Sequence, residues 1–296
     1  MLQGQVIKAS GGFFTVCDQN GAEYICLARG MLKRGSESLM VGDYVFFEPV
    51  KNNSHGAGGE GIIEKLLPRV NLLKRPHVSN VDQLAVIMSL KHPDCDWQLV
   101  SRMMVLAEKE GLSAFLCLNK TDLTQKNELE ELAGRLDNYP YRVIYTSAVS
   151  GTGLDRLKES LKGKCSVFAG PSGVGKSSLL NAVQAGLSLK TGTVSEKIKR
   201  GRHTTRQAEL MSLNLGGSVV DTPGFTRIDI SDLDAFQLAD YFPEFESLRG
   251  QCGFRNCQHI SEPRCAVREE VGKNLNPMRY EHYQYFIDEL DKQGVY

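Results

Sequence analysis

The sequence predicts a multidomain α+β protein in three parts: an N-terminal β-barrel, a central α/β domain and a mainly helical C-terminal domain. Three observations lead to this prediction. Strand-like runs separated by Gly-containing turns fill the first part, strands and helices alternate through the middle, and cysteines crowd near the C-terminus. We expect the domain boundaries at residues 1–70, 71–230 and 231–296.

The composition fits an ordinary folded chain. Of 296 residues, 41% are hydrophobic and 24% are charged, which excludes a disordered or fibrous protein. Lys+Arg and Asp+Glu both number 35, so nucleic-acid binding would need a local basic patch. We find no signal peptide and no apolar run near the roughly 18 residues of a membrane span. We therefore expect a cytoplasmic protein without a membrane partner.

The first part shows about five strands rich in aromatic and β-branched residues, at 6–9, 13–17, 23–28, 44–50 and 61–67. A Gly-rich stretch at 52–61 separates the last two strands. This pattern suits a small barrel or a sandwich.

The middle part alternates between strands and helices. Predicted strands lie at 83–90, 114–120, 141–148 and 165–170, with further strands at 207–215 and 218–221. Predicted helices lie at 97–111, 128–136 and 154–161, and another begins at Lys176. Such alternation is typical of a parallel sheet covered by helices. After about residue 230 the chain reads as helical, with a terminal helix at 275–290.

A phosphate-binding loop gives the strongest functional signal. The segment from Gly170 to Ser177 reads GPSGVGKS, and it lies between a predicted strand and a predicted helix. Its backbone N–H groups can wrap phosphates, Lys176 can reach the β- and γ-phosphates, and Ser177 can hold Mg²⁺. We predict nucleotide contacts from Gly170, Pro171, Ser172, Gly173, Val174, Gly175, Lys176, Ser177 and Ser178.

A second phosphate-side motif, DTPG, follows at the end of a predicted strand. Asp221 can reach Mg²⁺ through water, and Gly224 can donate its N–H to the γ-phosphate. Alone this motif is a common turn, but its position after a phosphate loop makes it stronger evidence for a nucleotide site.

Two more motifs indicate the base. The NKTD segment ends a predicted strand, and its Asp122 carboxylate can accept two hydrogen bonds from guanine, which adenine cannot offer. Asn119 can brace the loops, and the aliphatic stem of Lys120 can cover the base. The TSA segment at the end of the next strand can contact the guanine O6 through its backbone. We predict base-side contacts from Asn119, Lys120, Thr121, Asp122, Ser147 and Ala148.

The order of these motifs is reversed. In regulatory GTPases the phosphate loop comes first, whereas here NKTD and TSA precede it. The chain therefore resembles a circularly permuted P-loop GTPase, an arrangement that a fold with neighbouring termini can tolerate.

The C-terminal part carries a candidate metal site. Three thiols and one imidazole, with the spacing C-x₄-C-x-H-x₅-C, form a closed set typical of one structural Zn²⁺ per chain. The alternative is three buried free cysteines and a surface histidine. The four residues are Cys252, Cys257, His259 and Cys265.

Together, GPSGVGKS, DTPGF, NKTD, TSA, GRHTT at 201–205 and the Cys/His cluster resemble the family of ribosome small-subunit-dependent GTPases, which are bacterial assembly factors. The resemblance covers essentially the whole chain. It implies an N-terminal OB-fold, a zinc-binding C-terminal domain, and GTP hydrolysis stimulated by the small ribosomal subunit during late maturation. The expected partners are that subunit, its rRNA, and GTP or GDP with Mg²⁺. We expect a monomer.

A basic segment at 190–206 lies where a switch loop belongs, and it can also touch RNA phosphates. Either Thr204 or Thr205 could close on Mg²⁺ and the γ-phosphate. Phe225 stands where Ras-like enzymes carry a water-positioning Gln, which predicts slow intrinsic turnover. His203 is the candidate to orient the water, and the alternative is that it contacts RNA or solvent.

Two other functions stay open from the sequence. One is an RNA-docking module that uses GTP only as a structural ligand. The other is a P-loop kinase acting on a small molecule, against which Asp122 and DTPG argue.

Overall fold

The computed structural model describes residues 1–30, 38–50, 59–74, 77–184, 209–221 and 230–293. They belong to two compact units. The first comprises Met1–Gln83, Lys158–Phe168 and Gly192–Phe225, and the second Leu84–Leu157, Ala169–Thr191 and Thr226–Tyr296. The three-domain division predicted from the sequence stays a prediction.

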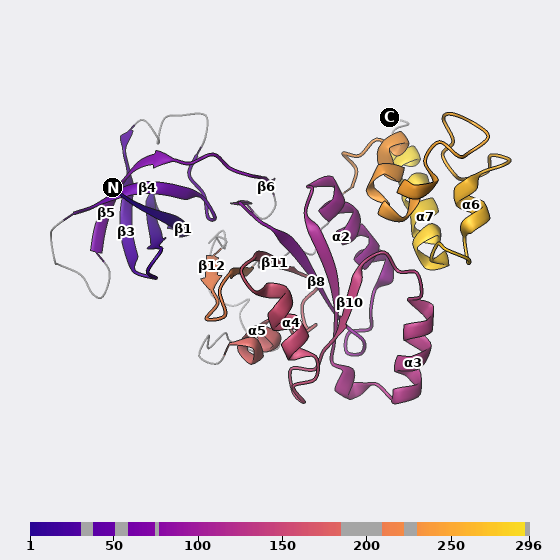
Figure 1. The fold of residues 1–296 in the computed structure, drawn as a ribbon, viewed down its shortest axis with the longest axis horizontal. Coiled ribbons are helices and arrows are strands. Elements are labelled where there is room, and N and C mark those ends of the chain that lie inside the picture. The colour runs from indigo at the N-terminus through magenta and orange to yellow at the C-terminus, as the bar shows by residue number, and fades with distance from the viewer. Residues whose placement is uncertain (31–37, 51–58, 75–76, 185–208, 222–229, 294–296) are drawn as a thin grey trace. The chain divides into compact units, whose positions relative to one another are not determined.

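The first unit begins with a closed five-stranded barrel (Figure 1). Its strands pair in the order β1–β2–β3–β5–β4, and β4 returns to pair with β1. The β3–β5 pair is parallel and the others are antiparallel. Closure confirms a barrel of the OB type. The strands are β1 (Leu2–Ser10), β2 (Phe13–Asp18), β3 (Glu23–Ala28), β4 (Tyr44–Val50) and β5 (Gly59–Leu66).

Alternation along these strands places one set of side chains in the barrel. The core contains six completely buried residues, Val6, Val16, Cys26, Val45, Phe47 and Ile63. The residues between them point outward, as the two-residue period of a strand requires.

Buried polar contacts fasten the chain that leaves the barrel. The buried Asp43 carboxylate accepts hydrogen bonds from Arg69 Nε at 2.7 Å and Ser79 Oγ at 2.6 Å. Ser79 ends a short hairpin of β6 (Leu72–Lys74) and β7 (His77–Ser79), which the sequence analysis did not predict.

Three more strands complete the first unit. β13 (Ser218–Asp221) pairs in parallel with β11 (Cys165–Ala169) and antiparallel with β12 (Glu209–Ser212). β12 also pairs with β1 at Lys8 and Glu209. The alternation predicted for the middle of the chain therefore includes an antiparallel pair near its end.

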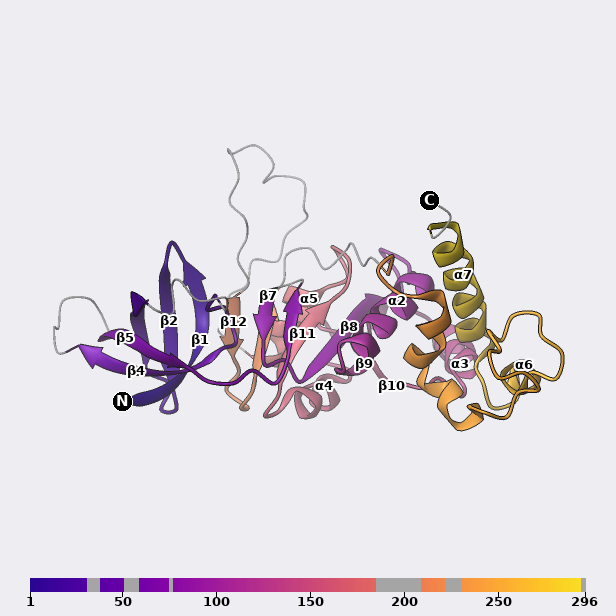
Figure 2. The same ribbon diagram turned by 90° about the horizontal axis from the view of Figure 1, so that it is seen from above.

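The second unit contains the three-stranded order β10–β9–β8. The β9–β10 pair is parallel, and every residue of β8 is buried, as predicted for a central strand. Helices follow the strands in alternation (Figure 2). The elements that lie wholly or partly in this unit are β8 (Gln83–Ser89), α2 (Trp97–Lys109), β9 (Ser113–Asn119), η1 (Thr121–Leu123), α3 (Lys126–Arg135), β10 (Arg142–Tyr145), α4 (Leu154–Leu161) and α5 (Lys176–Val183).

The C-terminal part of the second unit is helical, but two of its helices are 3-10 rather than α. It contains η2 (Ala235–Tyr241), η3 (Pro243–Leu248), α6 (Ala266–Glu270) and α7 (Pro277–Gln293). Its core joins Phe242, Tyr283 and Phe286 to Val105 of α2. Two polar contacts reinforce this packing, from Arg102 to Glu289 and from Ser101 to His282.

Candidate nucleotide site and metal centre

The phosphate loop joins β11 to α5 by a backbone path that requires glycine. Gly170 has a φ of +144°, and a Cβ there would lie 2.0 Å from the carbonyl oxygen of Ile87. Gly175 has a φ of +95°, and a Cβ there would lie 2.4 Å from Asn119 Nδ2. The loop is therefore wedged between the ends of β8 and β9, with no room for side chains at these two points.

Lys176 begins α5 and turns back over the loop. Its Nζ donates hydrogen bonds to the carbonyl oxygens of Gly170 at 2.7 Å and Pro171 at 2.9 Å. The ammonium group is thus held above the loop backbone, next to the positive end of a helix. This arrangement suits a polyphosphate, because a helix N-terminus and a nearby ammonium group both favour anions. Ser177 and Ser178 follow in the first turn of α5.

Asn119 connects the predicted base motif to the phosphate loop. Its buried side chain donates from Nδ2 to the carbonyl oxygen of Val174 at 2.9 Å, and its Oδ1 accepts from Thr146 Oγ1 at 3.3 Å. One side chain therefore connects three of the four predicted motifs, namely NKTD, TSA and the phosphate loop. This is the bracing role that the sequence predicts for Asn119.

The rest of NKTD is fixed against the TSA segment. Both the N–H and the hydroxyl of Thr121 donate to the carbonyl oxygen of Thr146, at 3.1 Å each. Ser147 Oγ donates to Asp122 Oδ1 at 2.5 Å. The Asp122 side chain is otherwise exposed, and Ala148 follows on the same loop. The carboxylate is thus oriented by a neighbour and open toward a ligand.

A loop that the sequence analysis did not single out also lies beside this site. Lys120, in the left-handed conformation with a φ of +63°, donates from Nζ to the carbonyl oxygen of His92. Pro93 lies next to Gly173, at 3.6 Å from the position of a Cβ there. Ser89 Oγ holds this loop by donating to the carbonyl oxygen of Pro93 at 2.6 Å. Only the position of the loop, directly after a buried strand, could have indicated it.

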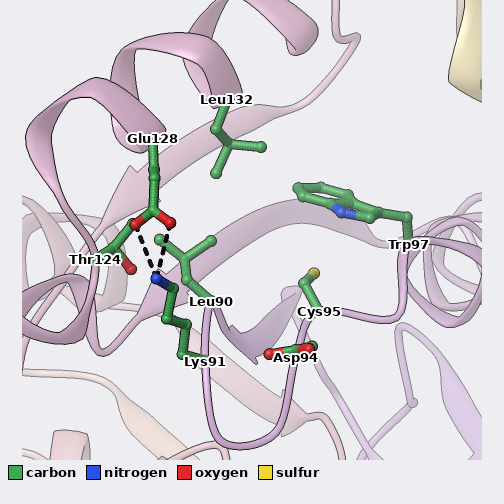
Figure 3. Close-up of a pocket in the computed structure, with 8 residues that line it drawn as sticks. All are labelled: Leu90, Lys91, Asp94, Cys95, Trp97, Thr124, Glu128 and Leu132. Atoms are coloured by element: carbon green, nitrogen blue, oxygen red, sulfur yellow. Dashed lines mark hydrogen bonds and ion pairs between the residues drawn. The ribbon is translucent and has the colours of Figure 1, made fainter.

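The same loop lines a pocket of about 240 Å³ (Figure 3). Lys91 Nζ donates to both carboxylate oxygens of Glu128, at 2.9 and 2.8 Å, and this contact lowers the pKa of Glu128. The ammonium group and the carboxylate thus neutralise each other within the pocket. Its lining consists of Leu90, Lys91, Asp94, Cys95, Trp97, Thr124, Glu128 and Leu132.

Most of the predicted catalytic residues are not placed. His203, Thr204, Thr205 and Gly224 lie outside the described residues. The backbone of Asp221 ends β13 opposite Glu209, but its side chain is not described. The structure thus joins the base motifs to the phosphate loop, while the predicted switch residues stay predictions.

The predicted metal ligands converge at one point. The ligand atoms of Cys252, Cys257, His259 and Cys265 all lie within 4.8 Å of one another. His259 Nδ1 is 3.6 Å from Cys252 Sγ and 3.3 Å from Cys265 Sγ. These separations suit the corners of a tetrahedron around one Zn²⁺ ion.

The electrostatics of this cluster also fit a cation. Burial, together with the neighbouring thiols, raises the pKa of Cys257 to about 12. Burial lowers the pKa of His259, which keeps its imidazole neutral and able to bind metal. A bound cation would be needed to stabilise the three sulfurs as thiolates in one place. The cluster is therefore a candidate zinc centre.

Surrounding contacts hold the ligand loops in place. Tyr280 and Tyr283 of α7 donate their hydroxyls to the carbonyl oxygens of His259 and Gln258, both at 2.7 Å. The Glu262 carboxylate accepts from the backbone N–H groups of Gln258 and Ile260, at 2.6 and 2.9 Å. The loops are thus anchored to the longest helix of the C-terminal part, a support that ligand spacing alone does not reveal.

None of the helices in the described part of the chain has the length and apolar character needed to span a bilayer.

Comparison with known proteins agrees with this geometry. Two family models match, "RsgA GTPase" over residues 66–231 and "RsgA N-terminal domain" over residues 3–57. A relative from Moorella thermoacetica, named small ribosomal subunit biogenesis GTPase RsgA, is 44% identical over 98% of this chain and 97% of its own length. A relative from Thermotoga maritima with the same name is 41% identical over 97% of this chain and 96% of its own.

Two solved structures match along nearly the whole chain. YjeQ from Thermotoga maritima gives a TM-score of 0.83 at 38% identity, covering 98% of each chain. YloQ, described as a circularly permuted GTPase, gives 0.81 at 32% identity, covering 99% of this chain and 96% of its own. The permuted motif order and the closed barrel are thus features of this fold. The chain belongs to the RsgA GTPase family, and it is a GTP-hydrolysing enzyme.

Proposed function

We propose that this GTPase binds the small ribosomal subunit and acts in its late maturation, with slow intrinsic hydrolysis that the subunit stimulates. The observation that carries the proposal is full-length similarity to proteins named small ribosomal subunit biogenesis GTPase, at 44% identity in one case. The site supports it, because Asn119 joins a guanine-type motif to a phosphate loop. Such a site favours GTP over ATP.

The proposed nucleotide contacts divide between base and phosphates. Asp122 accepts from the guanine N1–H and N2 amine, and the backbone of Ser147 and Ala148 meets O6. The loop from Gly170 to Ser178 wraps the phosphates, and Lys176 exchanges its two backbone carbonyl partners for phosphate oxygens. These exchanges require no rearrangement of Asn119.

Magnesium bound with GTP would neutralise charge on the phosphates, and Ser177 and Asp221 are the residues that would hold it. Gly224 would contribute its N–H to the γ-phosphate, and Thr204 or Thr205 would complete the phosphate side. With Phe225 in place of a glutamine, another group must orient water. We assign that role to His203, which would act once its loop is ordered on the subunit.

The proposal also includes a division of labour along the chain. Residues 1–70 form the barrel, which contributes to contact with rRNA. Residues 71–230 form the permuted GTPase domain, and residues 231–296 form the zinc-binding domain. The matches at 3–57 and 66–231 support the first two. The basic segment 190–206 would add contacts to rRNA phosphates. We further propose one structural zinc per chain, a monomer, and a cytoplasmic location, where ribosomes assemble.

The experiment is GTP turnover by the full chain with and without purified small ribosomal subunits, and with ATP as the control nucleotide. Strong stimulation that is specific to GTP and to the small subunit is expected. GTP-dependent binding to the subunit without stimulated turnover would indicate a docking module instead. Equal use of ATP would contradict the assignment of Asp122.

Replacing His203 by Ala should abolish the stimulated rate and leave GTP affinity nearly unchanged, because the imidazole is assigned to the water and not to the nucleotide. The measurement pairs subunit-stimulated turnover with nucleotide titration. A stimulated rate equal to that of the wild-type protein would remove His203 from the mechanism.

A further inference from the structure

The outer face of the barrel carries an apolar block that strand register fixes. Phe13 of β2 lies opposite Leu27 of β3, and Leu27 lies opposite Ile62 of β5. One step along the same face, Ile25 of β3 lies between Thr15 of β2 and Glu60 of β5. Directly paired residues point to the same side of a sheet, so these side chains form one continuous surface.

This surface is open to solvent. Relative exposure is 53% for Phe13, 53% for Ile25, 44% for Leu27 and 40% for Ile62. The alternate residues Cys26 and Ile63 are completely buried inside the barrel, so the exposed residues are not a displaced part of its core. Large apolar side chains gathered on one exposed face mark an interaction site more often than isolated ones do.

Carboxylates are interleaved with the apolar block. Glu48 of β4 lies directly opposite Ile62, and Glu60 lies between Ile25 and Val50, another exposed apolar residue. Within the part of the chain that the structure describes, neither Glu48 nor Glu60 forms an ion pair. Two neighbouring cations are already paired: Arg29 with Glu64, and Lys8, which lies opposite Thr15, with Glu209. The described face is thus apolar and negatively charged.

These features do not match a nucleic-acid surface. Single-stranded nucleic acids bind where basic side chains follow the phosphate backbone and several aromatic rings stack on the bases. Here Phe13 is the one aromatic residue among the paired outward positions described above, and unpaired carboxylates would repel phosphates. A protein segment with lysines or arginines beside apolar side chains would complement both properties of the face.

We propose that the outer face formed by Phe13, Ile25, Leu27, Ile62, Glu48 and Glu60 docks a basic, partly apolar protein segment of the small ribosomal subunit. The inference rests on the proposed function and refines it. Contact with rRNA, including the contact proposed for the barrel, then falls to surfaces other than this face, which binds a ribosomal protein.

Charge reversal distinguishes the two kinds of partner by sign. The full-length double variant E48K/E60K should bind purified small subunits about tenfold more weakly, because two attractive carboxylates become repulsive ammonium groups. If RNA phosphates faced this surface, the same variant would bind more tightly. The control is E281K/D288K, which changes the net charge equally on exposed positions of α7.

Two further measurements complete the test. The variant I25S/L27S should also lose about tenfold in affinity, since the apolar block is removed without any change of charge. A photoreactive phenylalanine analogue at position 13 should crosslink to a subunit protein, giving an adduct sensitive to protease and resistant to ribonuclease. Circular dichroism and thermal unfolding would check that the variants, altered only at exposed positions, remain folded.

The inference is overturned by a crosslink to rRNA, by tighter binding of E48K/E60K, or by unchanged affinity of both double variants. If the wild-type chain itself failed to bind the subunit, the proposed function would fall, and this docking partner with it. Failure of the inference alone would appear as normal wild-type binding with unaffected variants.

Discussion

Asn119 and Val174, in segments far apart along the chain, are joined by a hydrogen bond of 2.9 Å from the asparagine Nδ2 to the valine carbonyl oxygen. This contact holds the base motif and the phosphate loop in a fixed relation. Because the two motifs lie in different segments of the chain, a side-chain contact is what connects them.

Replacing Asn119 by Ala should weaken GTP binding by about 1–3 kcal/mol, since a buried hydrogen bond is lost at both the phosphate loop and Thr146. Titration with a fluorescent GTP analogue would measure the loss. Asn20→Ala, at an exposed turn of the barrel, is the matched control. Equal affinity of the two variants would contradict the bracing role.

Replacing Asp122 by Asn should change the base that is preferred. Guanine would lose its paired acceptor, at a cost of about 1–3 kcal/mol, while xanthine offers a carbonyl that the new amide can meet. Displacement of a fluorescent GTP analogue by GTP and by XTP would measure this change in base preference. Glu131→Gln on the exposed side of α3 should leave the GTP preference intact. An unaltered preference in Asp122→Asn would place the base elsewhere.

Replacing Arg279 by Met should destabilise the protein by about 3–5 kcal/mol, because the buried Glu244 carboxylate would lose its cation. Arg279 is completely buried, its Nε lies 2.8 Å from Glu244 Oε1, and its guanidinium stacks on Phe242 at 4.4 Å. Denaturant unfolding would give the loss. The double variant Arg279→Met with Glu244→Met should recover much of it, and a double variant as unstable as the single would argue against charge pairing.

Removing the zinc centre should loosen the C-terminal part. Cys252→Ser should abolish bound zinc and lower the Tm by more than about 5 °C, because the ligand loops lose their common anchor. Metal analysis and thermal unfolding would be compared with Cys17→Ser, a half-buried thiol of the barrel. Full zinc content in Cys252→Ser would show that this thiol is not a ligand.

Acid should weaken the contact between α2 and α7 through His282. Burial, helped by Arg279, lowers the pKa of His282 to about 4, below its value of about 6.5 in an unfolded chain. The unfolded state therefore binds the proton first, and stability falls as pH drops from about 6.5 to 4. The loss is about 1–2 kcal/mol for a partly exposed ring. The free energy of unfolding of His282→Gln should depend less on pH across this range than that of the wild-type protein. An identical pH dependence would show that His282 does not cause the loss of stability.

Local pattern was enough to predict many of the elements. The apolar spacing of α2 and the continuous apolar run of β8 identified both elements to within two residues of their ends. The phosphate loop was found because its glycines are needed for backbone reasons that hold in any chain. The four clustered side chains could be singled out as candidate metal ligands because three thiols and an imidazole at such short spacing are typical of a zinc site.

Other features depend on contacts between distant segments. Barrel and sandwich could not be separated, since closure depends on the pairing of β1 with β4. The β6–β7 hairpin has strands of three residues, too short for a period to appear. The loop around Pro93 carries no motif, and its contacts with Lys120 and Gly173 join distant segments.

The sharing of α2 has a consequence for how this protein could be divided. Val105 of this helix belongs to the same core as α7, and Arg102 is bonded to Glu289, so one helix serves both the nucleotide-binding sheet and the metal-bearing region. A chain shortened at residue 230 would expose Val105, which otherwise packs in this core. The region that carries the candidate metal cluster is thus a folding partner of the nucleotide-binding sheet, and we expect loss of this region to lower the stability of the whole unit.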